Sequence, residues 1–335
     1  MIVLRQLATA TAIALALVAG AAQAQEAKGK LVIAGGEFRY DNPAWQKFVD
    51  LAGGKDAPVV VFPTASSNGP KYGKQATENL VRLGAKAELL PVALKRFDVN
   101  YKDAVKDPAL VEKVRKAKGI YFIGGGQERI TQVLYNEDGS PTPMLQAVWD
   151  AYKDGAVVGG SSAGAAIMSK MMFKDAMDSL DTMKFGITPG KQVDRGLGFI
   201  GDDWFVDQHF IQRGRFARSL VAMRDFGYKY GIGVDENTAV VVTNGKDAEV
   251  VGYHGAVIMD LRNATSDKNA PYFNIKGAKL SYVAAGDKID LKTLEITPTE
   301  LKKGDLVLDP KGKDFDPYVT EAKDFTFPNV LAPNG

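Results

Sequence analysis

The sequence contains no cysteine among its 335 residues. A disulfide framework, a lipid-modified cysteine and a thiol nucleophile are therefore excluded, so any covalent catalysis falls to another side chain. Histidine is almost as rare, with two residues, and no His, Asp and Glu spacing typical of a metal site is present. We expect neither a metal ion nor another cofactor.

The chain also lacks an excess of charge of one sign. It has 42 Lys and Arg against 40 Asp and Glu, and the basic residues are scattered along its length. Nucleic-acid-binding proteins gather their basic residues in a patch or a stripe. We therefore expect no nucleic-acid partner.

Long apolar runs are absent except at the start of the chain. Residues 1–24 contain Arg5, a stretch rich in Ala and Leu, and the sequence Ala22-Gln23-Ala24. These features are typical of a bacterial secretory signal peptide, and the stretch is too short and too rich in alanine for a membrane span. No other stretch reaches the ~18 apolar residues that a span needs. We expect cleavage near Ala24, no membrane anchor, and a mature protein in the periplasm or outside the cell.

The sequence pattern of the mature chain predicts alternating strands and helices. Strands are expected at 31–36, 58–64, 87–92, 119–123 and from 157 to a turn at Ser162, and helices at 75–83, 111–117 and 143–152. The run 58–64 is continuously apolar, as a strand covered on both faces requires. The predicted fold class is α/β, with an open, mostly parallel sheet flanked by helices and its site at the carboxyl edge.

The last third of the chain has a different pattern. Residues 238–243 and 249–260 are strand-like and are separated by Asn244-Gly245, a strong hairpin signal. A short strand is also expected around 278–283. We predict three parts: a signal peptide (1–24), one catalytic domain (25–262), and a β-rich extension packed on that domain (263–335), poorly ordered after Pro310.

The most informative motif is the G-x-S-x-G frame from Gly160 to Gly164. A serine at the corner between a strand and a helix projects its hydroxyl from a strained turn, beside backbone N–H groups that can bind an oxyanion. Ser162 is therefore a candidate nucleophile. By itself the motif is equally compatible with a small-residue connection that binds nothing or a phosphate.

A nucleophilic serine needs a base, and the two histidines are the candidates. His254 follows Gly252-Tyr253 near a turn, where a structural or surface role is the simpler interpretation. His209 lies at the end of a predicted strand among polar residues and just before three arginines. If a Ser–His pair exists, His209 is the better base.

Polar residues crowd the segment around His209: Asp207, Gln208, Arg213, Arg215 and Arg218. Arginine binds carboxylates through two parallel hydrogen bonds, so such a site would favour an acidic substrate. The alternative is a solvated cationic helix face, because Arg215 and Arg218 are three residues apart. The residues alone indicate a secreted hydrolase with a preference for carboxylates.

Four segments in order resemble the cyanophycinase group of serine peptidases, related to dipeptidase E. They are Gly124–Gln127, Gly160–Ala165, Asp207–Arg218 and Gly231–Ala239. The resemblance covers about residues 30–260. It implies a flavodoxin-like three-layer fold like that of the class I glutamine amidotransferases, with serine in place of the usual cysteine.

The resemblance also implies roles for single residues. Ser162 would be the nucleophile and His209 its base, and the oxyanion hole would combine the Ala163 N–H with one from the Gly125-Gly126 turn. Glu236 would orient His209, with Asp235 as the alternative. The substrate pocket would be lined by Gln127, Asp207, Gln208, Arg213, Arg215 and Arg218. The family often has Asp where Gly126 stands, so one pocket contact is missing here.

The implied substrate is cyanophycin, a poly-aspartate backbone with arginine on each β-carboxyl, and the implied product is the β-Asp-Arg dipeptide. A peptide or polymer rich in aspartate and arginine is thus the expected partner. Three alternatives stay open: a secreted aspartyl peptidase with another substrate, an esterase-like hydrolase, and a non-catalytic protein that binds anionic peptides. The sequence also leaves open whether the chain forms a homodimer.

Overall fold

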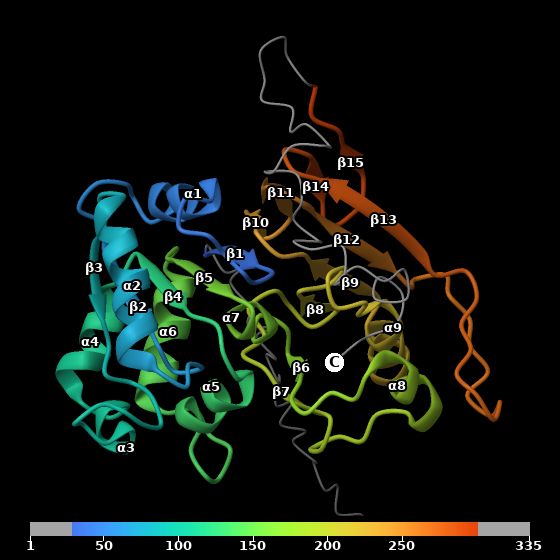
Figure 1. The fold of residues 1–335 in the computed structure, drawn as a ribbon, viewed down its shortest axis with the longest axis horizontal. Helices are drawn as coiled ribbons and strands as arrows, with labels where there is room; N and C mark the ends of the chain where they lie inside the picture. The colour runs from blue at the N-terminus through green and yellow to red at the C-terminus, as the bar shows by residue number, and fades with distance from the viewer. Residues whose placement is uncertain (1–28, 301–335) are drawn as a thin grey trace, which may run out of the picture.

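A computed structural model describes residues 29–300. The predicted signal peptide and the segment after Pro310 lie outside the described residues. Five parallel strands form the centre of the fold, in the order β1-β5-β4-β2-β3 (Figure 1). Their bounds are β1 Lys30–Ala34, β2 Pro58–Phe62, β3 Lys86–Leu89, β4 Gly119–Phe122 and β5 Val157–Ser161. The predicted open, mostly parallel sheet is confirmed.

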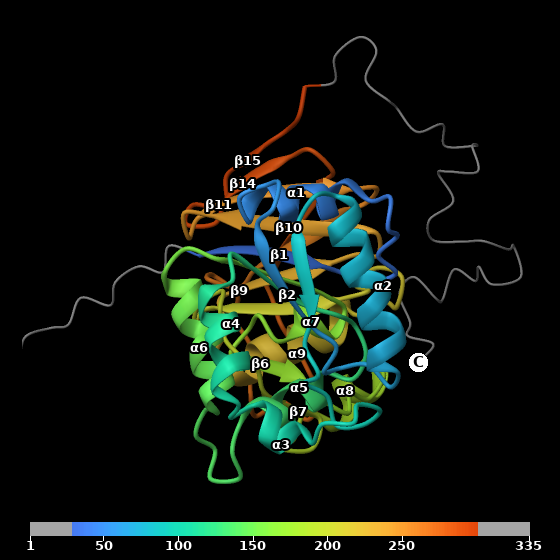
Figure 2. The same ribbon diagram turned by 90° about the vertical axis from the view of Figure 1, so that its left-hand side faces the viewer.

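Helices cover both faces of this sheet. Helices α1 (Pro43–Leu51) and α2 (Gly69–Arg82) pack on one face, and α4 (Pro108–Lys116), α5 (Gln127–Leu134), α6 (Pro143–Lys153) and α7 (Ala163–Ala166) on the other. Figure 2 shows α2 on one side of the central strands and α4 and α6 on the opposite side. The three-layer arrangement explains why the central strands carry apolar residues without alternation.

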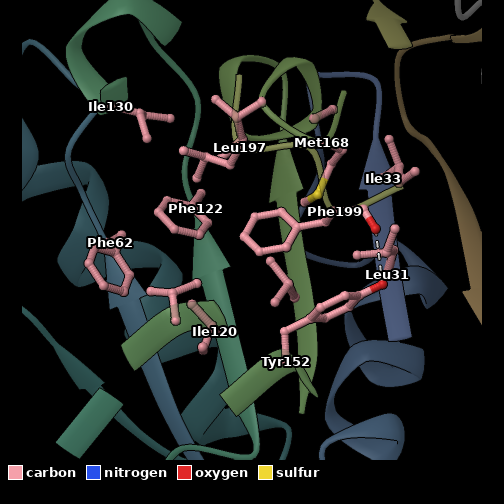
Figure 3. Close-up of a cluster of buried hydrophobic side chains, with 14 of the residues drawn as sticks. Leu31, Ile33, Phe62, Ile120, Phe122, Ile130, Tyr152, Met168, Leu197 and Phe199 are labelled. Atoms are coloured by element: carbon pink, nitrogen blue, oxygen red, sulfur yellow. Dashed lines mark hydrogen bonds between the residues drawn. The ribbon is translucent and has the colours of Figure 1, made fainter. Parts of the chain in front are cut away.

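Side chains from alternate strand positions enter the two cores. Ile33, Phe62 and Phe122 face the α6 side, where the Tyr152 hydroxyl donates a hydrogen bond to the Phe199 carbonyl at 3.1 Å (Figure 3). Their neighbours Val32 and Val61 face α1 and α2. This period of two is the geometry of a strand, and it ties both helical layers to one sheet.

Antiparallel strands extend the sheet beyond β1 to nine strands. These strands are β10 Thr238–Thr243, β11 Asp247–Gly252, β14 Lys288–Asp290 and β15 Ile296–Thr297. A second, four-stranded sheet has the order β13-β12-β9-β8. Its strands are β8 Trp204–Gln208, β9 Tyr230–Val234, β12 Gly255–Asp260 and β13 Lys279–Ala284, and it packs between the α6-side core and α9 (Phe216–Phe226).

The prediction of one strand at 249–260 is wrong, because the structure has two strands there. The chain breaks between β11 and β12, so that β11 pairs with β10 in the large sheet and β12 pairs with β9 in the small one. Gly252 permits the break because its φ is +133° and an added Cβ would lie 2.4 Å from the Asn237 carbonyl oxygen. The turn at 253–254 thereby joins the two sheets beside the predicted Glu236 segment.

Two helices begin earlier than expected. The structure starts α2 at Gly69 and α4 at Pro108, against expectations of residues 75 and 111. Proline in the first turn has no N–H to leave unsatisfied, and the Asp107 side chain accepts from the first free N–H groups of α4. The apolar periodicity marked only the part of each helix that carries buried apolar side chains, such as Ala76 and Leu80 in α2 and Val111 and Val114 in α4.

Short elements complete the described chain: α3 Tyr101–Ala104, α8 Ser179–Phe185, and the paired strands β6 Met171–Phe173 and β7 Val193–Arg195. Residues after 262 contribute β13 to the small sheet and β14 and β15 to the large one. The domain boundary at 262 stays a prediction. Among residues 29–300, no helix has both the length and the apolar character needed to cross a bilayer.

Candidate active site

The carboxyl ends of β1, β5 and β4 meet at one edge of the large sheet. Ala34 is in register with Ser161, and Phe122 with Gly160. The residues that follow these strands are therefore neighbours: the Gly35-Gly36 turn, Ser162, and the 124–126 loop. Strand order places the candidate site here, at the edge where parallel sheets present their loops.

Ser162 occupies a strained turn between β5 and α7. Its φ of 53° and ψ of −109° lie outside the ordinary regions for a residue with a Cβ. The glycines of the motif permit the close packing of this turn, since a Cβ on Gly160 would lie 2.6 Å from the Gly164 backbone. The turn directs the Ser162 hydroxyl toward the end of β8.

His209 follows β8 and faces Ser162. Its Nε2 lies 2.9 Å from Ser162 Oγ, and its Nδ1 lies 2.6 Å from Glu236 Oε1. The His209 N–H donates to the Gly35 carbonyl at 2.8 Å, which fixes the residue to the end of β1. Hydroxyl, imidazole and carboxylate thus form one continuous hydrogen-bonded chain, and His209 is only 4% exposed.

Gly36 shapes the place of the imidazole. A Cβ at this position would lie 2.1 Å from His209 Cε1, and the glycine has a φ of +128°. No other residue fits here without moving the ring. In the sequence, Gly35-Gly36 indicates only the end of a strand and gives no sign of a link to the histidine.

The 124–126 loop lies against the serine. A Cβ on Gly124 would lie 3.3 Å from Ser162 Cβ, and a Cβ on Gly125 would lie 2.1 Å from the Ala65 carbonyl oxygen. The Gly126 N–H donates to that same oxygen at 2.9 Å. Within the described residues, the N–H groups of Gly125 and Ala163 have no acceptor. Of the two glycines expected to serve an oxyanion, Gly125 is the one whose N–H is available.

The structure separates the two candidate acids. Glu236 contacts His209, whereas the Asp235 carboxylate is fully buried, with Oδ2 3.9 Å from His254 Nδ1 and Oδ1 accepting from the Gln212 N–H at 3.3 Å. His254 is buried beside these acids, and burial lowers its pKa to about 4. Neighbouring residues at a strand end point in opposite directions, so only one of the pair can reach the imidazole.

Asp207 is the centre of a buried ionic cluster. Arg218 donates to both of its oxygens at 2.9 and 2.7 Å, Arg215 approaches to 3.3 Å, and the Ser219 hydroxyl donates at 3.0 Å. Burial alone would raise the pKa of Asp207, but the charges of Arg218 and Arg215 hold it below its usual value. Through Asp207, the ionic cluster fixes the end of β8 directly before His209.

The remaining predicted pocket residues lie at different depths. Gln208 Oε1 lies 3.5 Å from Ser162 Oγ, so Gln208 borders the serine directly. Arg213 is exposed, and its backbone N–H donates to the His209 carbonyl at 3.0 Å. Gln127 is half-buried and donates to the Phe173 carbonyl at 2.7 Å. Of these three residues, Gln208 is therefore the one whose side chain contacts a reacting group.

Known proteins share this chain's sequence pattern. The model of Peptidase family S51 matches residues 31–250. The chain belongs to peptidase family S51. It is a serine-type peptidase, which sets aside the esterase-like and non-catalytic alternatives.

Two curated relatives of this S51 peptidase are named cyanophycinase. The protein of Geminocystis herdmanii (strain PCC 6308) is 32% identical over 235 residues, covering 69% of this chain and 79% of its own. That of Nostoc sp. (strain PCC 7120 / SAG 25.82 / UTEX 2576) is 27% identical over 280 residues, covering 80% and 87%. The crystal structure of a peptidase from an acI-B1 Actinobacterium has a TM-score of 0.57 at 23% identity, covering 79% of this chain and 98% of its own. This likeness shows that the chain and the actinobacterial peptidase share a fold.

Breaking the ionic cluster of the S51 peptidase should destabilise the fold strongly. Asp207→Asn leaves two buried guanidinium groups without their carboxylate, so we expect the free energy of unfolding to fall by about 3–5 kcal/mol. Urea denaturation measures this change. The matched control is Asp41→Asn, because Asp41 forms an exposed pair with Arg39 and should cost less than ~1 kcal/mol. Equal losses in the two variants would contradict the structural role of the cluster.

Proposed function

We propose that this S51 peptidase is a secreted cyanophycinase, which hydrolyses aspartyl-linked bonds of cyanophycin and releases β-Asp-Arg dipeptides. The observation that carries the proposal is the continuous chain from Ser162 through His209 to Glu236. The names of the two curated relatives support the choice of substrate. The sequence 1–24 supports export.

In the proposed reaction, Ser162 Oγ attacks the scissile carbonyl carbon while His209 Nε2 accepts the hydroxyl proton. The N–H groups of Gly125 and Ala163 bind the oxyanion of the tetrahedral intermediate. His209 then donates the proton to the leaving amine, which departs and leaves an acyl-enzyme. Water, deprotonated by His209, hydrolyses the ester and restores Ser162.

Glu236 accepts from the Nδ1–H of His209 throughout this cycle. The short Nδ1–Oε1 contact of 2.6 Å fixes the tautomer that leaves Nε2 free to take the serine proton. The carboxylate also stabilises the imidazolium that forms in the transition state. Glu236 is therefore the proposed third member of the triad.

Arg213 and Gln208 are the groups proposed to hold the substrate beside the bond that is cut. Arg213 is exposed, and its positive charge is close enough to lower the pKa of His209. Its guanidinium can bind the carboxylate of an aspartyl residue in a bidentate manner. The Gln208 amide next to Ser162 can bind the peptide backbone.

The pH profile should reflect the environment of His209. Burial lowers the pKa of His209 from its usual 6.5, the hydrogen bond to Glu236 raises it in part, and Arg213 lowers it further, with a lowered pKa as the result. A base acts in its neutral form, so kcat/KM should reach half its maximum below pH 6.5 and stay flat toward neutral pH. Rates on a soluble substrate between pH 4 and 8 measure this. A half-maximum at or above 6.5 would contradict it.

Incubation of the purified mature chain with insoluble cyanophycin tests the substrate. We expect the suspension to clear and mass spectrometry to find β-Asp-Arg in the supernatant. Peptides with aspartate in ordinary α-linkage serve as the comparison. Cleavage of those peptides without release of dipeptide from cyanophycin would instead support a secreted aspartyl peptidase.

Export is tested separately, by N-terminal sequencing of protein recovered outside the cytoplasm. The sequence should begin near Gln25, and a start at Met1 would contradict export.

A further inference from the structure

A groove of about 860 Å³ lies between α3, α5 and β7, along the helix that follows the 124–126 loop of the proposed catalytic site. These elements lie near the bottom of both Figure 1 and Figure 2. The groove is not lined by Ser162, His209 or Glu236, so the proposed mechanism does not use it. Its volume is in the range of ordinary ligand sites.

The groove begins where the active-site loop ends. Gly124 lies against Ser162, and α5 starts three residues later at Gln127. The next residue, Glu128, lines the groove, as does Lys174, which follows Phe173. The hydrogen bond from Gln127 to the Phe173 carbonyl joins the two residues that directly precede Glu128 and Lys174 in the chain, so this end of the groove lies toward the active-site loop.

The lining carries both charges in equal number. Four basic and four acidic side chains face it: Lys102, Lys106, Lys174, Arg195, Glu128, Glu137, Asp138 and Asp194. Two ion pairs of the lining are exposed to solvent, Lys102 with Glu137 at 3.2 Å and Lys174 with Asp194 at 3.3 Å. Exposed ion pairs contribute little to stability. A ligand that carries both charges can therefore take the place of one side chain in such a pair at a small cost in free energy.

A planar floor lies among these charges. The guanidinium of Arg195 lies 3.9 Å from the centre of the Tyr135 ring, and its Nη1 donates to the Gly139 carbonyl at 2.8 Å. The Tyr135 hydroxyl donates to the Gly196 carbonyl at 3.3 Å. Both side chains are thus held in place, and together they present a fixed aromatic and cationic surface in the groove.

We propose that this groove binds the part of a zwitterionic polypeptide that continues beyond the bond being cut. The ligand class is a chain that bears carboxylates and guanidinium groups in alternation. Its carboxylates pair with Lys102, Lys106 and Lys174, and its guanidinium groups pair with the acidic side chains. The inference rests on the proposed function for the identity of the polymer, and it adds an extended site that retains the polymer between cleavage events.

The test separates binding from hydrolysis by using the Ser162→Ala chain. Its affinity for insoluble cyanophycin is measured by co-sedimentation at 0.1 M salt. The groove variant adds Lys102→Gln, Lys106→Gln, Glu137→Gln and Asp138→Asn, which remove two charges of each sign. The amide that replaces the Asp138 carboxylate keeps an oxygen that can accept from Ser140 in the turn. The matched control adds Lys74→Gln, Glu78→Gln, Glu112→Gln and Lys116→Gln, which remove the same charges from exposed pairs on α2 and α4.

We expect the groove variant to bind cyanophycin at least tenfold more weakly, and the control variant to bind within twofold of the parent. Poly-aspartate, which carries one sign only, should bind all three proteins weakly. Equal affinity of groove and control variants, no sedimentation of the parent, or equally tight binding of poly-aspartate would each overturn the inference. Binding without cleavage by the wild-type chain would contradict the proposed function and leave the groove assignment in place.

Discussion

Replacement of Ser162 by alanine is expected to lower kcat by about 10⁴- to 10⁶-fold. The substitution removes the only hydroxyl that contacts His209 Nε2 among the described residues, at 2.9 Å. Because the change deletes one oxygen atom, the fold and Tm should stay close to those of the wild type. Release of product from a soluble fragment of the polymer measures the rate, and thermal unfolding measures the stability.

The neighbouring Ser161→Ala variant controls for disturbance of the turn. Ser161 ends β5 and is also partly exposed, but its hydroxyl does not contact the imidazole. We expect this variant to retain kcat within about tenfold. If Ser161→Ala were inactive and Ser162→Ala active, the assignment of the nucleophile would be wrong.

The second large effect is expected for Glu236→Gln, with a loss of about 10⁴-fold in kcat. A carboxylate accepts the Nδ1–H of His209, whereas an amide can offer its NH₂ to the ring and favour the wrong tautomer. Glu236 is only 8% exposed, so bulk water cannot substitute for the lost acceptor. Steady-state kinetics on the same soluble substrate measure the change.

Asp235→Asn is the comparison for the acid. Asp235 faces His254 and the Gln212 N–H rather than His209. We expect this variant to lose stability, because the side chain is fully buried, and to keep kcat per folded molecule within about tenfold. A larger loss for Asp235→Asn than for Glu236→Gln would reverse the assignment of the third triad member.

The sequence predicted the parts of the molecule that have local signals. Continuous apolar runs predicted the central parallel strands, because helices cover both of their faces. The glycines of the Gly160–Gly164 frame predicted the strained turn. Because the chain has only two histidines, His209 could be predicted as the base. The first two signals depend on residues within a few positions of one another, whereas the histidine count is a property of the whole chain.

Features that depend on distant segments were not predictable in this way. The small sheet and the break at Gly252 arise because β11 and β12 pair with different strands. The sequence could not distinguish Glu236 from Asp235, because the choice depends on which face of the strand end meets His209. Asp207 was expected in the pocket, but its two arginine partners hold it in a buried cluster. From the sequence, Gly36 could be recognised only as the end of a strand, although its lack of a side chain makes room for the imidazole of His209.

The central claim is that Ser162, His209 and Glu236 act as one unit. The most direct test is a double-mutant cycle on kcat with Ser162→Ala, Glu236→Gln and the double variant. Because Glu236 is proposed to act only through His209 on the serine, the double variant should be no slower than Ser162→Ala alone. Losses that multiply, giving a double variant about 10⁴-fold below Ser162→Ala, would show that Glu236 acts independently of the serine and would contradict the account.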